Sequence, residues 1–150
     1  MKIGIVSDHR GFKLKQVLVE YLVKRKYEVY DYGTDSTQSV DYPKYAFLLG
    51  EKVSNHDVDF GIAICGSGIG ISIACNKVKN IRCAKVDNVD EAYHTRMDND
   101  ANILALSGNM PKYKAKDIVD TFLSTDFSNS ERHINRIKQI ALYESGDDIE

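Results

Sequence analysis

Five short apolar runs, rich in isoleucine, valine and tyrosine, recur along the chain. Within each run the apolar residues are nearly continuous and do not alternate with polar ones. Strands that are buried on both faces have this pattern, which is typical of a parallel sheet covered by helices. The predicted strands are Lys2–Ser7, Tyr27–Tyr32, Val58–Ile64, Ile81–Val86 and Asn102–Leu106.

The segments between these runs carry helix signals. Apolar side chains such as Leu14, Leu18 and Leu22 recur on one face of a helix. Proline opens two other segments, at a helix position where its missing N–H costs nothing. The predicted helices are Phe12–Arg25, one from Pro43, one that begins within Ser67–Gly70 and runs through Asn76, Asp90–Met97, Pro111–Ser124 and Ser130–Glu144, before a frayed tail at 145–150.

Alternation of strands and helices over residues 1–150 predicts one doubly wound α/β domain with right-handed crossovers. In such folds ligands bind beyond the carboxyl ends of the strands, near the point where the strand order reverses. The residues that directly follow predicted strands are therefore the candidates for function.

Composition narrows the possible classes. The net charge is −2 and the Lys and Arg residues are dispersed, which disfavours nucleic-acid binding. No apolar stretch approaches the ~20 residues of a membrane span, and no signal segment is evident, so we expect a cytoplasmic protein without membrane partners. The three cysteines have spacings that match neither a disulfide framework nor a zinc site, and we predict no metal and no cofactor.

Two predicted strands end in polar or glycine-rich turns. Asp8 and His9 follow the first strand, where a helix cap and a solvated loop residue are the simpler interpretations. Cys65 follows the third strand and heads the loop Gly66-Ser67-Gly68-Ile69-Gly70. Three glycines allow several backbone N–H groups to converge on an anion, and a thiol beside them can be reactive.

Other candidates lie later in the chain. Asp98 and Asn99 belong to a polar loop that precedes the fifth strand, where capping is the simpler interpretation. Arg132 and Arg136 are four residues apart on the last predicted helix, which puts both guanidinium groups on one face. A solvated charged face is the simpler explanation, but the pair also suits a phosphate dianion.

The motifs SDHRGFKLK, DYGT, VDYP, ICGSGIGISIACNK, NDANILAL and ERHINR, in this order, resemble the type B ribose-5-phosphate isomerases and galactose-6-phosphate isomerase subunits. The resemblance runs from residue 2 to about residue 144. It implies a Rossmann-like three-layer α/β/α sandwich with a five-stranded parallel sheet. It also implies a homodimer or tetramer with active sites between subunits, and metal-free interconversion of aldose and ketose phosphates through an enediolate.

The resemblance also assigns roles to residues. Cys65 matches the base of one branch of the family, whereas the other branch uses a Glu at the position of Ile71. Ser67 is our candidate for proton transfer between O1 and O2 of the sugar. The matched substrate-binding positions are Asp8, His9, the loop residues Gly66, Ser67, Gly68, Ile69 and Gly70, Asn99 contributed by a partner subunit, and the phosphate-binding Arg132 and Arg136.

Two positions depart from the family pattern. Asp98 stands where members usually have a His assigned to opening the furanose ring, so its role as a catalytic residue is a prediction. Asn109 stands where an Arg or Lys usually contacts phosphate, a loss worth roughly 1.5–3 kcal/mol if nothing replaces it. His94, four residues before Asp98, is a candidate substitute for the missing His.

Ribose 5-phosphate/ribulose 5-phosphate isomerisation is therefore the leading hypothesis. The alternatives are an isomerase of allose, galactose or tetrulose phosphates, and a non-catalytic subunit that only binds sugar phosphates. A nucleotide-binding Rossmann domain is disfavoured, because no acidic residue follows a GxGxxG motif at the required distance.

Overall fold

The computed structural model describes all residues from Met1 to Glu150. Five parallel strands form one sheet, as predicted, and their order in it is β2-β1-β3-β5-β4. Their bounds are β1 Lys2–Ser7, β2 Glu28–Asp31, β3 Phe60–Cys65, β4 Cys83–Lys85 and β5 Ile103–Ser107. The chain extends the sheet to one side of β1 with β2 and to the other with β3, so the strand order reverses between β1 and β3.

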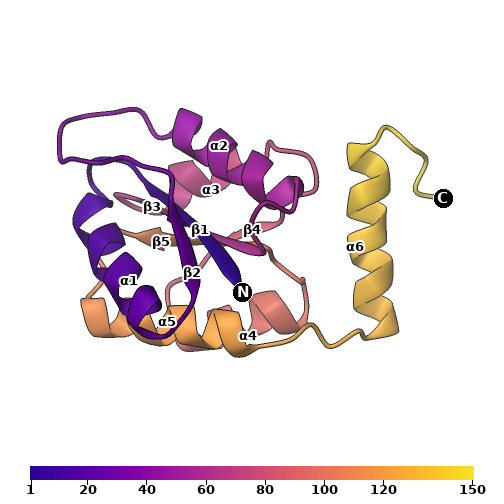
Figure 1. The fold of residues 1–150 in the computed structure, drawn as a ribbon. Coiled ribbons are helices and arrows are strands. Elements are labelled where there is room, and N and C mark those ends of the chain that lie inside the picture. Colours follow the sequence, from indigo (N-terminus) through magenta and orange to yellow (C-terminus); the bar gives the residue numbers. More distant parts are fainter.

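Helices cover both faces of the sheet, which gives the predicted Rossmann-like α/β/α sandwich (Figure 1). On one face α1, α4 and α5 pack against side chains of β1, β3 and β5 around a core that includes Leu18, Ile62 and Phe122. On the other face α2 and α3 pack around Leu49, Ile71 and Ile103. The helices are α1 Phe12–Lys24, α2 Pro43–Ser54, α3 Ile69–Cys75, α4 Val89–Met97, α5 Lys112–Ser124 and α6 Glu131–Glu144.

Element ends differ slightly from the predicted ones. Pro111 and Ser130 are the N-cap residues of α5 and α6, so each helix begins one residue later than predicted. The predicted strand Val58–Ile64 begins at Phe60, although Val58 is buried in the core beneath α2. Apolarity reports burial, whereas the strand begins where pairing with β1 begins, at Phe60 opposite Ile3.

Helix α6 stands apart from the sandwich (Figure 1). None of its residues is buried, and Ile134, Ile140 and Tyr143 are exposed apolar side chains on it. Within the chain, α6 is held by polar contacts near its two ends, from His133 to Asp98 and from Glu144 to the backbone N–H of Asn80. No helix has the length and apolarity needed to cross a membrane.

Candidate active site

The carboxyl ends of β1 and β3 bring two of the predicted positions together. Ser7 at the end of β1 is in register with Ile64, and the N–H of Asp8 donates to the carbonyl of Ile64 at 3.1 Å. Asp8 and Cys65 therefore follow adjacent strands at the point where the strand order reverses. This is where an open α/β sheet leaves a crevice for a ligand.

Cys65 is 4% exposed and heads the glycine-rich loop. Its Sγ lies 3.2 Å from the backbone nitrogen of Gly68, which donates an N–H to the sulfur. Gly68 has a φ of 79°, in the left-handed region that favours glycine, and this turn points its N–H back toward the thiol. The loop therefore holds the sulfur at a fixed position at the head of α3.

The loop keeps several backbone donors available. The N–H of Ile69 donates to Ser67 Oγ at 3.1 Å and that of Gly68 to the thiol, whereas the N–H groups of Gly66, Ser67 and Gly70 donate to no atom of the chain. Of the three glycines, only Gly68 has a positive φ. Free, fixed N–H groups beside a nucleophile are suited to an oxyanion or a phosphate.

Asp8 and His9 occupy the turn between β1 and α1. Asp8 is 5% exposed, and its Oδ1 accepts N–H groups from Arg10 at 2.9 Å and Gly11 at 3.1 Å. The residue that caps α1 is Gly11, so Asp8 braces the preceding turn and is not the helix cap. Nδ1 of His9 lies 3.2 Å from both the carbonyl oxygen and the amide nitrogen of Val40, which fixes the ring and leaves Nε2 without a partner in the chain.

The turn after β5 supports the glycine-rich loop from the side. The N–H of Gly108 donates to the carbonyl of Cys65 at 2.8 Å, and Ser107 Oγ donates to that of Gly66 at 2.7 Å. Asn109 reaches the same carbonyl of Gly66 through Nδ2 at 3.5 Å. Asn109 thus lies beside the loop but brings no charge to it.

Two side chains that sequence reasoning left unassigned lie directly on the loop. A Cβ added to Gly66 would lie 3.0 Å from Cδ and 3.2 Å from Nη1 of Arg10, and one added to Gly70 would lie 2.6 Å from the hydroxyl of Tyr42. Both residues belong to motifs that carry the resemblance, SDHRGFKLK and VDYP. Their motif membership was the available signal, but only the fold brings them onto the glycines.

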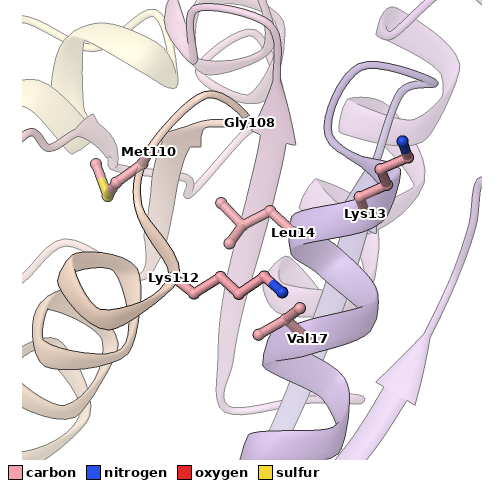
Figure 2. A pocket seen from close by; sticks show the side chains of 6 residues that line it. All are labelled: Lys13, Leu14, Val17, Gly108, Met110 and Lys112. Carbon is pink, nitrogen blue, oxygen red and sulfur yellow. The ribbon is translucent and has the colours of Figure 1, made fainter.

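A groove of about 340 Å³ borders this region between α1 and the turn that leads into α5. It is lined by Lys13, Leu14, Val17, Gly108, Met110 and Lys112 (Figure 2). In Figure 2 the side chain of Lys112 extends toward Val17, whereas the amine of Lys13 points away from the groove. The groove shares Gly108 with the turn that supports Cys65.

Asp98 and Asn99 lie beyond the amino ends of the strands, opposite to the carboxyl ends where Cys65 and Asp8 lie. Arg82, directly before β4, donates from Nε to the carbonyl of Asn99 at 3.0 Å and from Nη2 to that of Asp100 at 2.9 Å. Cys65 and Asp8 follow the ends of their strands, whereas this loop precedes β5. Asn99 therefore cannot meet Cys65 of its own chain.

The carboxylate of Asp98 lies between two imidazoles. Oδ2 is 3.4 Å from Nδ1 of His94, and Oδ1 is 3.4 Å from Nε2 of His133 on α6. His94 and Asp98 thus lie side by side, and His133 is an additional neighbour that spacing could not reveal. Arg132 and Arg136 are exposed on α6, outside the sandwich.

The fold is an α/β sandwich with a thiol at the head of a glycine-rich loop, and the chain belongs to the ribose/galactose isomerase family, whose profile matches residues 3–140. The chain is 44% identical over 146 residues to the protein YwlF of Bacillus subtilis, covering 96% of this chain and 97% of that one. It is 41% identical over 144 residues to ribose-5-phosphate isomerase B of Escherichia coli, covering 95% and 96%.

Solved structures agree with the fold in detail. Ribose-5-phosphate isomerase B of Clostridium thermocellum superposes with a TM-score of 0.95 at 47% identity, covering 97% of this chain and 99% of that one. The Mycoplasma genitalium enzyme with bound ribulose-5-phosphate gives a TM-score of 0.91 at 39% identity, covering 96% of each chain. The predicted family and fold class are therefore confirmed, and the chain is a sugar-phosphate isomerase.

Proposed function

We propose that this enzyme interconverts ribose 5-phosphate and ribulose 5-phosphate in the cytoplasm, without metal, and that Cys65 is the base. The observation that carries the proposal is the buried thiol of Cys65 beside three free backbone N–H groups, at the point where the strand order reverses. The bound ribulose-5-phosphate in the Mycoplasma genitalium relative, which is similar over nearly its whole length, supports this choice of substrate.

In the proposed reaction the Cys65 thiolate removes the proton from C2 of the open-chain aldose. The electron pair moves into the C1–C2 bond and negative charge develops on O1. Free N–H groups of Gly66, Ser67 and Gly70 are donors for that charge, and one well-placed donor is worth roughly 3–4 kcal/mol in comparable sites. Ser67, exposed at the loop, passes a proton from O2 to O1, and the Cys65 thiol returns its proton to C1.

The test replaces Cys65 by Ala and follows ribulose 5-phosphate formation in EDTA. We expect turnover to fall by at least about 100-fold, because general base catalysis contributes 10²–10⁴-fold, while the fold and substrate binding are kept. Cys75→Ala is the matched control, since it removes an equally buried thiol ten residues further on, outside the site. Substantial activity in Cys65→Ala would remove Cys65 from the base role.

We further propose that two copies of the chain complete each site. The loop lies at the carboxyl ends of the strands with Cys65 and Asp8, whereas Asp98 and Asn99 lie at the amino ends. Arg132 and Arg136 are on α6, which buries none of its own side chains and presents exposed apolar ones. In a symmetric dimer the same two surfaces meet twice, which gives two equivalent sites.

Complementation tests the shared site. Cys65→Ala and Asn99→Ala chains are each expected to be inactive, and co-expression is expected to restore activity at roughly a quarter of the sites, since half of the dimers are mixed and each has one intact site. Unmixed variants that elute as dimers are the control. No restored activity in verified mixed dimers would show that each chain builds its site alone.

A different sugar phosphate is the second candidate, and Asp98 and Asn109 favour it because both replace residues that are usual in the family. A site whose polar groups do not match a substrate's hydroxyls discriminates strongly against that substrate. The same assay with tetrose and hexose phosphates separates the two candidates. A higher kcat/KM for one of these than for ribose 5-phosphate would favour the second.

A further inference from the structure

Arg10 is an unpaired cation whose side chain lies against the glycine-rich loop. Its side chain lies over Gly66, with Nη1 3.2 Å and Nε 3.5 Å from the position of a Cβ on that glycine. Arg10 is exposed, and its side chain forms no ion pair and no hydrogen bond with any residue. Only its backbone N–H is bonded, since it donates to Asp8 Oδ1. A guanidinium group that rests on the loop next to Cys65 without a partner is free to bind an anion.

We propose that Arg10 binds the phosphate group of the sugar-phosphate substrate, and in this chain takes over the role of a cation that Asn109 does not supply. The inference deepens the proposed function and rests on it for the identity of the substrate. A planar guanidinium can bind two phosphate oxygens at once, which suits a dianion better than the single charge developing on O1.

The charges around the loop explain why a cation is needed there. Asp8, on the adjacent strand end, is a carboxylate that would repel a phosphate dianion, and Asn109 is neutral. Arg132 and Arg136 of the same chain are on α6, far from this edge of the sheet (Figure 1). Arg10 is thus the cation that a single chain places directly on the glycine-rich loop.

Backbone contacts place Arg10 more firmly than its exposure suggests. Its N–H is held by Asp8 Oδ1 at 2.9 Å, and a Cβ on Gly108 would lie 2.4 Å from the carbonyl oxygen of Arg10. The turn that carries Asn109 is therefore packed against the backbone of Arg10. The side chains of both residues reach Gly66, with Arg10 Nη1 3.2 Å from the position of a Cβ on that glycine and Asn109 Nδ2 3.5 Å from its carbonyl oxygen.

The test compares Arg10→Ala with Lys13→Ala. Lys13 is a nearby cation whose amine points away from the groove (Figure 2), so its removal controls for the general loss of one positive charge. Two measurements are made for each variant: the KM and kcat for ribose 5-phosphate, and the Kd for inorganic phosphate by calorimetry. Thermal unfolding of each variant verifies the fold, and Arg10→Lys retains the charge without the planar fork.

We expect Arg10→Ala to raise both the KM and the phosphate Kd by roughly 10- to 100-fold, the value of a charge-assisted contact, with kcat within about twofold of wild type. For Arg10→Lys, both constants should lie between those of the wild type and those of Arg10→Ala. Lys13→Ala should change neither constant by more than about twofold. An unchanged phosphate Kd in folded Arg10→Ala, equal losses in Lys13→Ala, or a fall in kcat alone would overturn the assignment.

Failure of the two proposals can be told apart. If the wild-type enzyme binds inorganic phosphate through Arg10 but does not isomerise ribose 5-phosphate, the proposed substrate is wrong and the role of Arg10 stands. If the wild-type enzyme isomerises ribose 5-phosphate and Arg10→Ala matches it in KM and phosphate Kd, the substrate stands and the role of Arg10 is wrong.

Discussion

Replacement of Gly68 by alanine tests whether the loop's backbone geometry controls the thiol. Gly68 has a φ of 79°, and an added Cβ would lie 2.9 Å from the carbonyl carbon and 3.0 Å from the carbonyl oxygen of Leu106. Leu106 is fully buried in β5, which is paired with β3 on one side and β4 on the other, so its backbone cannot move aside. The alanine variant must therefore shift the loop and withdraw the Gly68 N–H from Cys65 Sγ.

The expected cost has two parts. A left-handed backbone conformation costs a non-glycine residue about 1–2 kcal/mol, and forcing a methyl group into a packed core costs about 1–3 kcal/mol more. The sum, roughly 2–5 kcal/mol, is smaller than the 5–15 kcal/mol stability of a typical domain. At about 2–4 °C per kcal/mol for a chain of this size, Gly68→Ala should stay folded with a Tm lower by about 4–20 °C.

Gly146 provides a matched control. Its φ of 78° is nearly that of Gly68, but nothing lies within 4 Å of an added Cβ. Gly146→Ala has the cost of the left-handed backbone without the clash, so its free energy of unfolding should fall by no more than about 1–2 kcal/mol. Because the residue lies after α6, the kcat should be unchanged. Calorimetric unfolding and steady-state kinetics are measured for both variants. Equal Tm losses, or a Gly68→Ala enzyme with the wild-type kcat, would refute the reasoning.

Two further predictions concern stability and thiol reactivity. Lys15 is 1% exposed and its Nζ lies 2.6 Å from both carboxylate oxygens of Asp31. Asp31→Ala leaves this buried charge without a partner and should lower the free energy of unfolding by about 3 kcal/mol, whereas Lys15→Met should lower it clearly less. Urea unfolding measures both losses, and the reverse order would contradict the prediction. A hydrogen bond with Cys75, together with burial, raises the pKa of Cys83 well above its ordinary value. Its thiol should therefore stay protonated at neutral pH and react with iodoacetamide only as the pH rises through that raised pKa or after unfolding, whereas rapid native labelling in a peptide map at pH 7 would argue against it.

The existence of every strand followed from the apolar pattern, but the strand limits did not. The predicted strand Ile81–Val86 is reduced to Cys83–Lys85, because β4 is an edge strand that pairs only with β5. Ile81 and Val86 are buried on either side of the paired residues, and Val86 still donates its N–H to the carbonyl of Ala105 at 3.1 Å. Hydrophobic patterning reports which residues avoid water, and hydrogen-bonded neighbours decide where a strand begins and ends.

The sequence by itself determined the sheet of parallel strands, the order of the helices, and the thiol at the head of the glycine-rich loop, because periodicity and turn chemistry are local. Only the tertiary structure decided that Arg10 and Tyr42 lie on the loop glycines. It also decided that Asn99 and Cys65 lie at opposite ends of the strands. Such neighbours are far apart along the chain or on opposite ends of an element. Their positions depend on where the crossovers return each strand to the sheet, which no local pattern encodes.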